Sequence, residues 1–402
     1  MSLERCTVLS PSAAPADRPY PSPRSVGGRG AAPAPAVARN ENVFSFGGYG
    51  AAMADDDLKL GLVLGYWFAG PPVGVPEMLA AAEDLGFDSI WSAEAYGSDC
   101  FTPLAWWGSA TSKAKLGTAV CQMSARTPVA TAMSALTMDH LSGGRFQLGL
   151  GASGPQVVEG WYGQPYPKPL ARTREYVEII RRVLAREEPL DFQGEHYQLP
   201  NRGPGTMELG KPLKSITHPL RADIPILLGA EGPKNVAMAA EIADGWLPIF
   251  LSPELDKHYR ECLAEGFARP GARRTMDDFE IPNMVNIVVN DDVEAAADMV
   301  RMFLGFYIGG MGAKEVNFHA SLFARMGYGD EVEEIQDLFL AGRKDEAIKR
   351  VPLSLVEDVA MVGPLDKVRE ELDEKWRKTC MTTLLVNGGP DQLRLVADLV
   401  NG

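Results

Sequence analysis

The chain has 402 residues, which is enough for two or three average domains or for one large α/β barrel. Its 39 basic and 53 acidic side chains give a net charge of −14, which repels phosphate backbones and anionic lipids, so we expect no nucleic-acid or membrane partner. No apolar run reaches the roughly eighteen residues that a membrane-spanning helix needs. The five cysteines are scattered without CxxC spacing, which favours a reducing, cytoplasmic location and argues against a disulfide scaffold or a metal site.

Residues 1–52 differ in composition from the rest of the chain. They are rich in Ala, Pro, Gly and Ser, with five arginines, no lysine and three acids, and they contain no periodic apolar segment. We therefore expect a disordered leader without function, ahead of a domain at 53–402 that begins near Met53. A transit peptide is the alternative interpretation, although Pro and Gly at this density disfavour the amphipathic helix that such a peptide forms.

From residue 58 onward, short apolar runs alternate with stretches of helical periodicity. The apolar runs predict eight strands, at 58–65, 87–93, 115–123, 145–151, 224–229, 245–251, 281–290 and 382–387. Helices are predicted at 76–85, 103–112, 128–141, 172–186, 234–243, 254–266, 293–306, 365–378 and 391–400. Strands that are each followed by helical sequence indicate parallel pairing with helical crossovers, and they predict a (β/α)8 TIM barrel with insertions.

Two segments are longer than a simple strand–helix unit requires. Residues 189–223 contain an alternating stretch at 191–199 that predicts a hairpin, and residues 309–363 contain an extra amphipathic helix around 330–340. The active site of such a barrel lies at the carboxyl ends of the strands. We expect both insertions to cover this mouth of the barrel.

A glycine motif follows the fourth predicted strand. Residues 149–154 read GLGASG, which matches the dinucleotide-binding pattern GxGxxG. That pattern needs a helix that opens at its third glycine, whereas Pro155 and the Gly- and Pro-rich residues after it predict a loop. We therefore interpret the glycines as space for a flat group that approaches the strand end closely, and not as a Rossmann fingerprint.

A second candidate site is the strand-to-helix turn AEGPKN at 230–235. Pro233 stands where a first helical residue would, and the free amides before such a helix suit an anion, above all a phosphate. Lys234 would add positive charge, whereas Glu231 would oppose the anion unless its carboxylate points away. An ordinary capped helix is the alternative.

The five histidines lack metal-ligand spacing, and only His319, in the second insertion, is placed to reach the mouth.

Several motifs, taken in order, resemble one protein family. They are LSGGRF at 141–146, LGLG at 148–151, GWYG at 160–163, RTREY at 172–176, GPK at 232–234 and ADGW at 243–246. Together they resemble the bacterial luciferase-like monooxygenase superfamily over residues 58–400. The segments WSAEAYGSD at 91–99 and GGMGA at 309–313 are similar to an actinobacterial branch whose members are assigned to the deazaflavin coenzyme F420.

This resemblance implies a TIM barrel whose mouth holds the deazaflavin ring, with a non-prolyl cis peptide bond against one face of the ring. Alignment on the third strand places that bond at Ala119–Val120. The resemblance also implies that the phosphate tail lies on the amides around Glu231 and Gly232. The cofactor-binding candidates are therefore Ala119, Val120, Cys121, Gly151, Ser153, Gly154, Ala230, Glu231, Gly232, Lys234 and Pro248.

The residues for proton transfer depart from the family's pattern. Related dehydrogenases carry an acid followed by His at the end of the second strand, where this chain has Glu94-Ala95. The glutamate that sugar-phosphate dehydrogenases place after the fourth strand is Pro155 here, so a sugar phosphate is not the expected substrate. Glu94 ends a rigid strand and is therefore the first of four candidate proton donors or acceptors, which are Glu94, Tyr96, Asp99 and Glu159.

These features predict an oxidoreductase that transfers a hydride between F420 and an organic small molecule. A deazaflavin activates oxygen poorly, so reduction or dehydrogenation is favoured over oxygenation. Two alternatives stay open: an FMN-dependent monooxygenase supplied by a separate flavin reductase, and a barrel that binds a flavin as a carrier or store without turnover. The sequence is also compatible with a homodimer.

Overall fold

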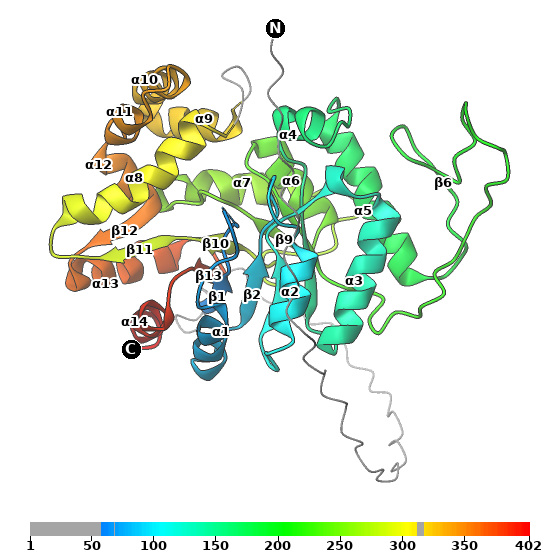
Figure 1. The fold of residues 1–402 in the computed structure, drawn as a ribbon, viewed down its shortest axis with the longest axis horizontal. Coiled ribbons are helices and arrows are strands. Elements are labelled where there is room, and N and C mark those ends of the chain that lie inside the picture. The colour runs from blue at the N-terminus through cyan, green and yellow to red at the C-terminus, as the bar shows by residue number, and fades with distance from the viewer. Residues whose placement is uncertain (1–57, 68, 312–316) are drawn as a thin grey trace, which may run out of the picture. The chain divides into compact units, whose positions relative to one another are not determined.

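The computed structural model describes residues 58–67, 69–311 and 317–402 (Figure 1). The predicted leader at 1–52 and the expected start near Met53 lie outside the described residues, as does part of the motif at 309–313. Within the described ranges, no helix is both long enough and apolar enough to cross a membrane.

Eight parallel strands form the centre of the domain. They follow one another in the order β10-β13-β1-β2-β3-β5-β8-β9, and hydrogen bonds of Glu280, just before β10, join it to β9 and close the ring. The strands are β1 (Lys59–Val63), β2 (Ser89–Ser92), β3 (Lys115–Thr118), β5 (Phe146–Gly151), β8 (Ile226–Gly229), β9 (Gly245–Leu247), β10 (Pro282–Met284) and β13 (Thr383–Val386). Each predicted strand region contains one of them, so the predicted barrel is confirmed.

Helices surround the barrel (Figure 1). The main ones are α1 (Val75–Asp84), α2 (Phe101–Gly108), α3 (Pro128–Ser142), α5 (Pro169–Ala185), α6 (Pro233–Ile242), α7 (Asp256–Phe267), α8 (Val293–Gly309), α13 (Leu365–Glu374) and α14 (Pro390–Asn401). Helix α3 shows how the sequence sets their ends. The Thr127 side chain accepts a hydrogen bond from the amide of Ala130, Pro128 begins the helix, and Gly143 ends it with a left-handed φ of 67°.

Two apolar clusters stabilise this arrangement. The larger lies between the strands and the helices, and the smaller fills the lumen of the barrel with Val63, Trp91, Leu227, Leu247 and Leu385. A Cβ atom on Gly117 of β3 would lie 2.3 Å from the ring of the fully buried Trp91. The glycine thus leaves the space that the indole occupies. The lumen is packed with side chains, and a ligand site belongs at the mouth.

The predicted strand at 281–290 is divided into two strands in the structure. β10 pairs with β13 in the barrel, whereas β11 (Asn286–Val289) pairs with β12 (Ala360–Gly363) in a separate two-stranded sheet. The apolar run continues across the break because residues on both sides are buried, so the pattern does not reveal the change of partner. The sequence does not predict β12 either, since four residues between two helices are too few to show a period.

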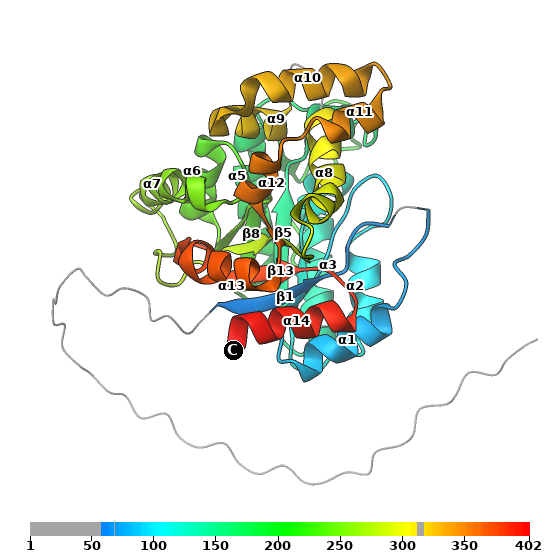
Figure 2. The ribbon, with the colours of Figure 1, turned by 90° about the vertical axis from the view of Figure 1, so that its left-hand side faces the viewer.

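The second insertion adds helices at the carboxyl-terminal end of the barrel (Figures 1 and 2). They are α9 (Phe318–Phe323), α10 (Gly329–Leu340), α11 (Lys344–Lys349) and α12 (Leu353–Val359). α10 confirms the predicted helix at 330–340, whereas the other three are too short to give a periodic signal. His319 of α9 contacts Glu231, directly after β8, so this insertion borders the mouth as expected.

The first insertion forms the predicted hairpin but does not cover the mouth. β6 (Phe192–Gln193) pairs antiparallel with β7 (Gln198–Leu199), and Glu175 on α5 accepts hydrogen bonds from three successive amides of the hairpin. Arg221 then pairs with the buried Asp139 near the end of α3 and donates to the carbonyl of Phe146, at the amino end of β5. The expectation for this segment is therefore wrong, because its charged groups find their partners along the outer helices.

Candidate active site

Strand β3 does not run straight to the mouth. It ends at Thr118, the Ala119–Val120 peptide bond is cis as predicted, and pairing with β5 resumes in β4 (Cys121–Gln122). Thr118 bridges the interrupted ladder, because its Oγ1 donates to the carbonyl oxygen of Gly149 at 2.8 Å and accepts from the Gly149 amide at 3.0 Å. Ala119 and Val120 pack on the apolar cluster of the lumen and remain partly exposed.

Val120 occupies space left by two glycines. A Cβ atom on Gly151 would lie 2.4 Å from Cγ2 of Val120, and one on Gly229 would lie 3.2 Å from its Cγ1. The glycine motif at 149–154, which includes Gly151 at the end of β5, predicts space for a flat ligand. In the structure that space holds Val120, and the partly exposed valine forms an apolar floor between β5 and β8.

Four other predicted cofactor contacts differ in exposure and in backbone conformation. Cys121 and Pro248 are buried, so neither offers an exposed surface for the predicted contact. Ser153 has a left-handed φ of 59°, and Gly154 is the N-cap of α4 (Pro155–Gly160). The predicted loop is wrong for residues 155–160, which form α4, whereas residues 161–168 form no helix or strand, as predicted. Pro155 at the first helical position accounts for the difference, because its fixed φ suits the first turn of a helix.

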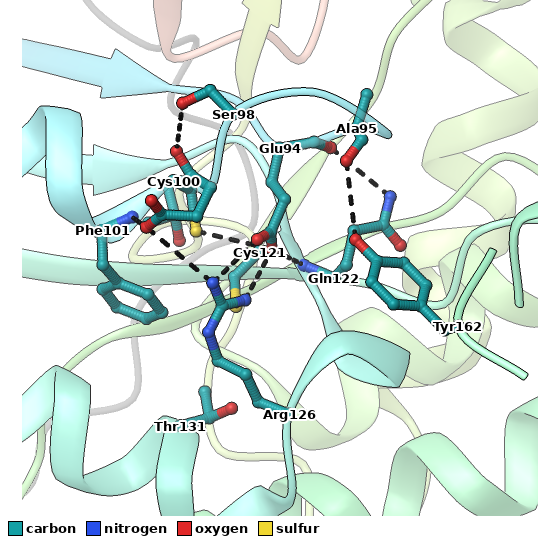
Figure 3. Close-up of polar contacts among 12 residues, drawn as sticks. Glu94, Ala95, Ser98, Cys100, Phe101, Cys121, Gln122, Arg126, Thr131 and Tyr162 are labelled. Carbon is teal, nitrogen blue, oxygen red and sulfur yellow. Dashed lines mark hydrogen bonds and ion pairs between the residues drawn. The ribbon is translucent and has the colours of Figure 1, made fainter. Parts of the chain in front are cut away.

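Glu94, the first candidate proton carrier, is held in an ion pair (Figure 3). Its Oε2 and Oε1 accept hydrogen bonds from Nη1 and Nη2 of Arg126 at 2.7 and 2.8 Å, and Oε2 also accepts from the amide of Gln122 at 2.8 Å. Burial disfavours the charge on Arg126, but its hydrogen bonds to Glu94 and the nearby negative groups raise its pKa. With three N–H donors on two oxygens, Glu94 is suited to joining the loops after β2 and β4 rather than to protonating a substrate.

Two buried thiols complete this cluster (Figure 3). Sγ of Cys100 lies 3.8 Å from Oε2 of Glu94, and Sγ of Cys121 lies 3.6 Å from Nη1 of Arg126. The ligand atoms of Glu94 and the two cysteines lie within 4.8 Å of one another, which is close enough for a metal site. However, burial and then the neighbouring Cys121 and Glu94 raise the pKa of the Cys100 thiol, and a protonated thiol is a poor metal ligand. The cluster therefore fits an ion pair within the protein better than a metal centre.

The other three candidate proton carriers do not meet at one point. Oδ1 of Asp99 accepts from two amides at the start of α2, at 2.9 and 2.8 Å, and lies 3.9 Å from Nη2 of Arg126. Tyr96 is half exposed, with its ring 6.4 Å from that of Trp161. Glu159 lies on the exposed side of α4. Asp99 is thus a helix cap, and these side chains form no shared centre for proton transfer.

The turn after β8 has an open backbone, as an anion site requires. Helix α6 begins at Pro233, with Gly232 as its N-cap. A Cβ atom on Gly232 would meet no atom closer than 3.7 Å, so an anion can approach the amides. The carbonyl of Ala230 accepts a hydrogen bond from Nε1 of Trp246 at 2.7 Å, which fixes the turn, and Lys234 is exposed beside it.

Glu231 directs its carboxylate away from this turn. Oε1 lies 2.7 Å from Nδ1 of His319 on α9, so the acid does not oppose an anion at the start of α6. The rings of Phe250 and Tyr307 meet the imidazole edge to face, with centroids 5.8 and 4.8 Å away. The prediction that His319 reaches the mouth is confirmed.

Two tyrosines lie near the pair of Glu231 and His319: Tyr307 contacts the imidazole, and Tyr66 follows β1. Burial, followed by the proximity of Tyr66, raises the pKa of Tyr307 well above its usual value. Sequence reasoning missed Tyr307 and Phe250, because both lie in apolar runs that predict core. It also missed Arg126, although this residue stands in the stretch after the third strand where a site was expected.

Comparison with known proteins identifies the family. The sequence profile of the luciferase-like monooxygenases matches residues 69–383. The chain belongs to the luciferase-like monooxygenase family. A Mycobacterium tuberculosis relative, provisionally named coenzyme F420-dependent oxidoreductase Rv3520c, is 60% identical over 344 residues, which cover 85% of this chain and 99% of the relative.

Two more distant proteins are similar to this chain, one in sequence and one in fold. A 5,10-methylenetetrahydromethanopterin reductase of Archaeoglobus fulgidus is 28% identical over 78% of this chain and 90% of its own. The solved structure of the coenzyme F420-dependent tetrahydromethanopterin reductase from Methanopyrus kandleri superposes with a TM-score of 0.67, at 23% identity. The superposition covers 87% of this chain and 98% of that one, so the fold is common to nearly all of both proteins.

Proposed function

We propose that this luciferase-like barrel is an oxidoreductase that transfers a hydride between coenzyme F420 and an organic small molecule. The 60% identity to the mycobacterial relative, over nearly its whole length, is the observation that carries the cofactor assignment. The motifs that resemble the F420 branch at 91–99 lie at the mouth of the barrel, where a cofactor would bind.

The residues at the mouth fit this cofactor. Val120 offers an apolar floor to a planar ring, and the open amides at Gly232 suit a phosphate, with Lys234 beside them. Gln122, two residues beyond Val120, has a buried Oε1 without a hydrogen-bond partner among the residues that the structure describes. This oxygen could therefore accept a hydrogen bond from an N–H group of the cofactor ring. Glu231 faces away from the phosphate turn, so it does not oppose the anion.

When bound, F420 supplies the chemistry, because its C5 atom accepts or releases a hydride. The protein would hold and orient it and exclude water. Ala119 and Val120 would lie beneath the ring, and Gly232 would bind the phosphate through backbone amides. The ion pair of Glu94 and Arg126 would keep the two loops beside the ring in place.

Titration of the full chain with F420 and with FMN, followed by cofactor fluorescence, tests this proposal. We expect F420 to bind at least about tenfold more tightly than FMN. Reduced F420 should then be oxidised by members of a panel of ketones, aldehydes and quinones, at equal rates with and without oxygen. Preference for FMN with consumption of oxygen would instead support a flavin monooxygenase. Tight F420 binding without turnover would indicate a carrier.

A substitution at the turn after β8 tests the phosphate site separately. Gly232→Val adds a branched side chain where nothing lies within 3.7 Å, so the fold should survive while the approach of a phosphate is obstructed. We expect F420 to bind roughly tenfold more weakly, with an unchanged melting temperature. Gly160→Ala, at the exposed end of α4, is the control and should leave F420 affinity unchanged. Unchanged affinity in folded Gly232→Val would place the phosphate elsewhere.

We also infer that the protein forms a homodimer through α2 and α3. A groove of about 720 Å³ between these helices is lined entirely by uncharged residues, and it exposes 77% of Trp106, 57% of Met133 and 73% of Leu141. Such contiguous apolar exposure is uncommon on a monomer, and a second copy presents the same apolar surface. Light scattering should give the molar mass of a dimer for the wild type and of a monomer for Trp106→Asp. A monomeric wild type would overturn this inference.

A further inference from the structure

The mouth contains a second acid whose hydrogen-bonding capacity is not used. Glu231 and His319 are 15% and 18% exposed, and Oε1 of the acid lies 2.7 Å from Nδ1 of the imidazole. This contact has the distance of an ion pair but not the geometry of a hydrogen bond, and Oε2 of Glu231 and Nδ1 of His319 have no hydrogen-bond partner among the described residues. Buried polar atoms are rarely left without partners, so we expect a bound ligand to supply a hydrogen-bond partner to this pair.

Aromatic rings border this pair. Phe250 and Tyr307 contact the imidazole in an edge-to-face arrangement, and Tyr66 lies close to Tyr307. A proton carrier enclosed by aromatic rings exchanges its proton with a bound molecule more readily than with solvent. The pair also lies at the end of the barrel to which the site was assigned, because Glu231 directly follows β8.

The other ionisable groups near the mouth are less suited to carry a proton. Both oxygens of Glu94 are engaged by Arg126, and Asp99 caps α2. The pKa of Tyr307 is raised well above its usual value by burial, so its hydroxyl stays protonated. Histidine is the side chain that ordinarily changes charge near neutral pH. Among these groups, an imidazole with one nitrogen next to a carboxylate has the arrangement that general acid–base catalysis uses.

We propose that His319 exchanges the proton that accompanies hydride transfer, and that Glu231 is the positioning residue that orients its ring. This proposal rests on the proposed function. In the reduction of a carbonyl group, the carbon accepts a hydride with both its electrons, the π pair of the C=O bond moves to the oxygen, and the oxygen takes a proton from His319. The coenzyme is oxidised by two electrons, the proton released from its ring goes to water, and the imidazole regains a proton from water.

Nuclear magnetic resonance of the full chain labelled with 15N-histidine tests the placement without turnover. The ring signals of His319 are assigned by their loss in His319→Asn. We expect oxidised F420 to shift these signals and not those of His258, which lies on α7 with its Nε2 3.8 Å from Sγ of Cys262. Glu231→Gln should change the balance of protonation between the two ring nitrogens of His319. If F420 binds and the His319 signals do not move, the proposal is overturned.

Kinetics with reduced F420 and the panel compound that the wild type reduces fastest test the role in catalysis. We expect His319→Asn to lower kcat by roughly 100-fold and to increase the solvent isotope effect, with KM and the F420 dissociation constant nearly unchanged. Glu231→Gln should lower kcat by about tenfold, and Glu231→Asp should restore part of the loss. His258→Asn is the matched control and should behave as the wild type.

The two proposals fail in different ways. A wild type that binds no F420 contradicts the proposed function. A wild type that binds and oxidises reduced F420, together with a His319→Asn variant that keeps the full kcat and isotope effect, contradicts the role of His319 alone.

Discussion

Two acids at the barrel mouth, the buried Glu94 and the partly buried Glu231, differ in how completely their oxygens are used. The carboxylate of Glu94 accepts four hydrogen bonds, two of them from Arg126. Among the residues that the structure describes, the carboxylate of Glu231 has one ion-pair contact, with His319, and its buried Oε2 has no hydrogen-bond partner. A completed network stabilises the backbone that carries it, whereas an incomplete one costs stability and is retained where a ligand completes it. Carboxylates in equivalent loops can thus serve structure in one case and chemistry in the other.

The two clusters also differ in how the chain assembles them. The Glu94 cluster joins the loop after β2 to the segment that continues the neighbouring strand β3 through β4, so the barrel itself brings the two together. The Glu231 cluster joins the loop after β8 to helix α9 of the second insertion. Strand pairing in the barrel is sufficient to form the Glu94 cluster, whereas the Glu231 cluster also requires the second insertion. Variation in that insertion would change the chemistry at the mouth without changing the barrel.

Removal of the cation from the completed cluster should have the largest effect on stability. Arg126→Met leaves the carboxylate of Glu94, 4% exposed, buried without its charge partner. We expect the free energy of unfolding to fall by about 3–5 kcal/mol, measured by urea denaturation. Arg394→Met, at an exposed pair with Asp391, is the control and should change it by less than about 0.5 kcal/mol. If Arg126→Met also costs less than about 1 kcal/mol, the cluster does not stabilise the loops.

A smaller effect is expected at the floor between the two clusters. In Gly151→Ala the new Cβ would lie 2.4 Å from Cγ2 of Val120, so the valine must move. We expect a loss of about 1–3 kcal/mol in unfolding free energy and weaker F420 binding in a fluorescence titration. Gly160→Ala is the matched control, since nothing lies within 4 Å of that exposed position. Equal F420 affinity for both variants would show that Val120 does not support the ring.

The smallest effect on stability is expected at the incomplete cluster. Glu231→Gln keeps the shape of the side chain and removes a charge whose Oε2 makes no hydrogen bond to any described residue. We expect the free energy of unfolding to change by less than about 1 kcal/mol in urea denaturation, although hydride transfer slows. A loss as large as that of Arg126→Met would mean that Glu231 is a structural acid like Glu94, and the contrast between the two clusters would disappear.

The sequence by itself determined the barrel and its mouth. A continuous apolar run indicates a strand that is buried on both faces, and an amphipathic segment indicates a helix that is buried on one face. The alternation of the two patterns therefore predicts a parallel barrel covered by helices. The motifs that resemble the family also located the cis bond at Ala119–Val120 and the turn at Gly232. These features depend on residues close together in the chain, so a local pattern is sufficient to predict them.

Only the tertiary structure decided which polar groups are engaged and which are free. Glu94 lies two residues beyond the end of β2, and its carboxylate is hydrogen-bonded to Arg126 in another loop, which removes it from the first place among proton carriers. Glu231 and His319 meet although one follows β8 and the other lies in an insertion. Periodicity records whether a side chain is buried but not which distant side chain it meets. Because the charge and availability of a buried acid depend on that partner, its role is set by the fold and not by the local sequence.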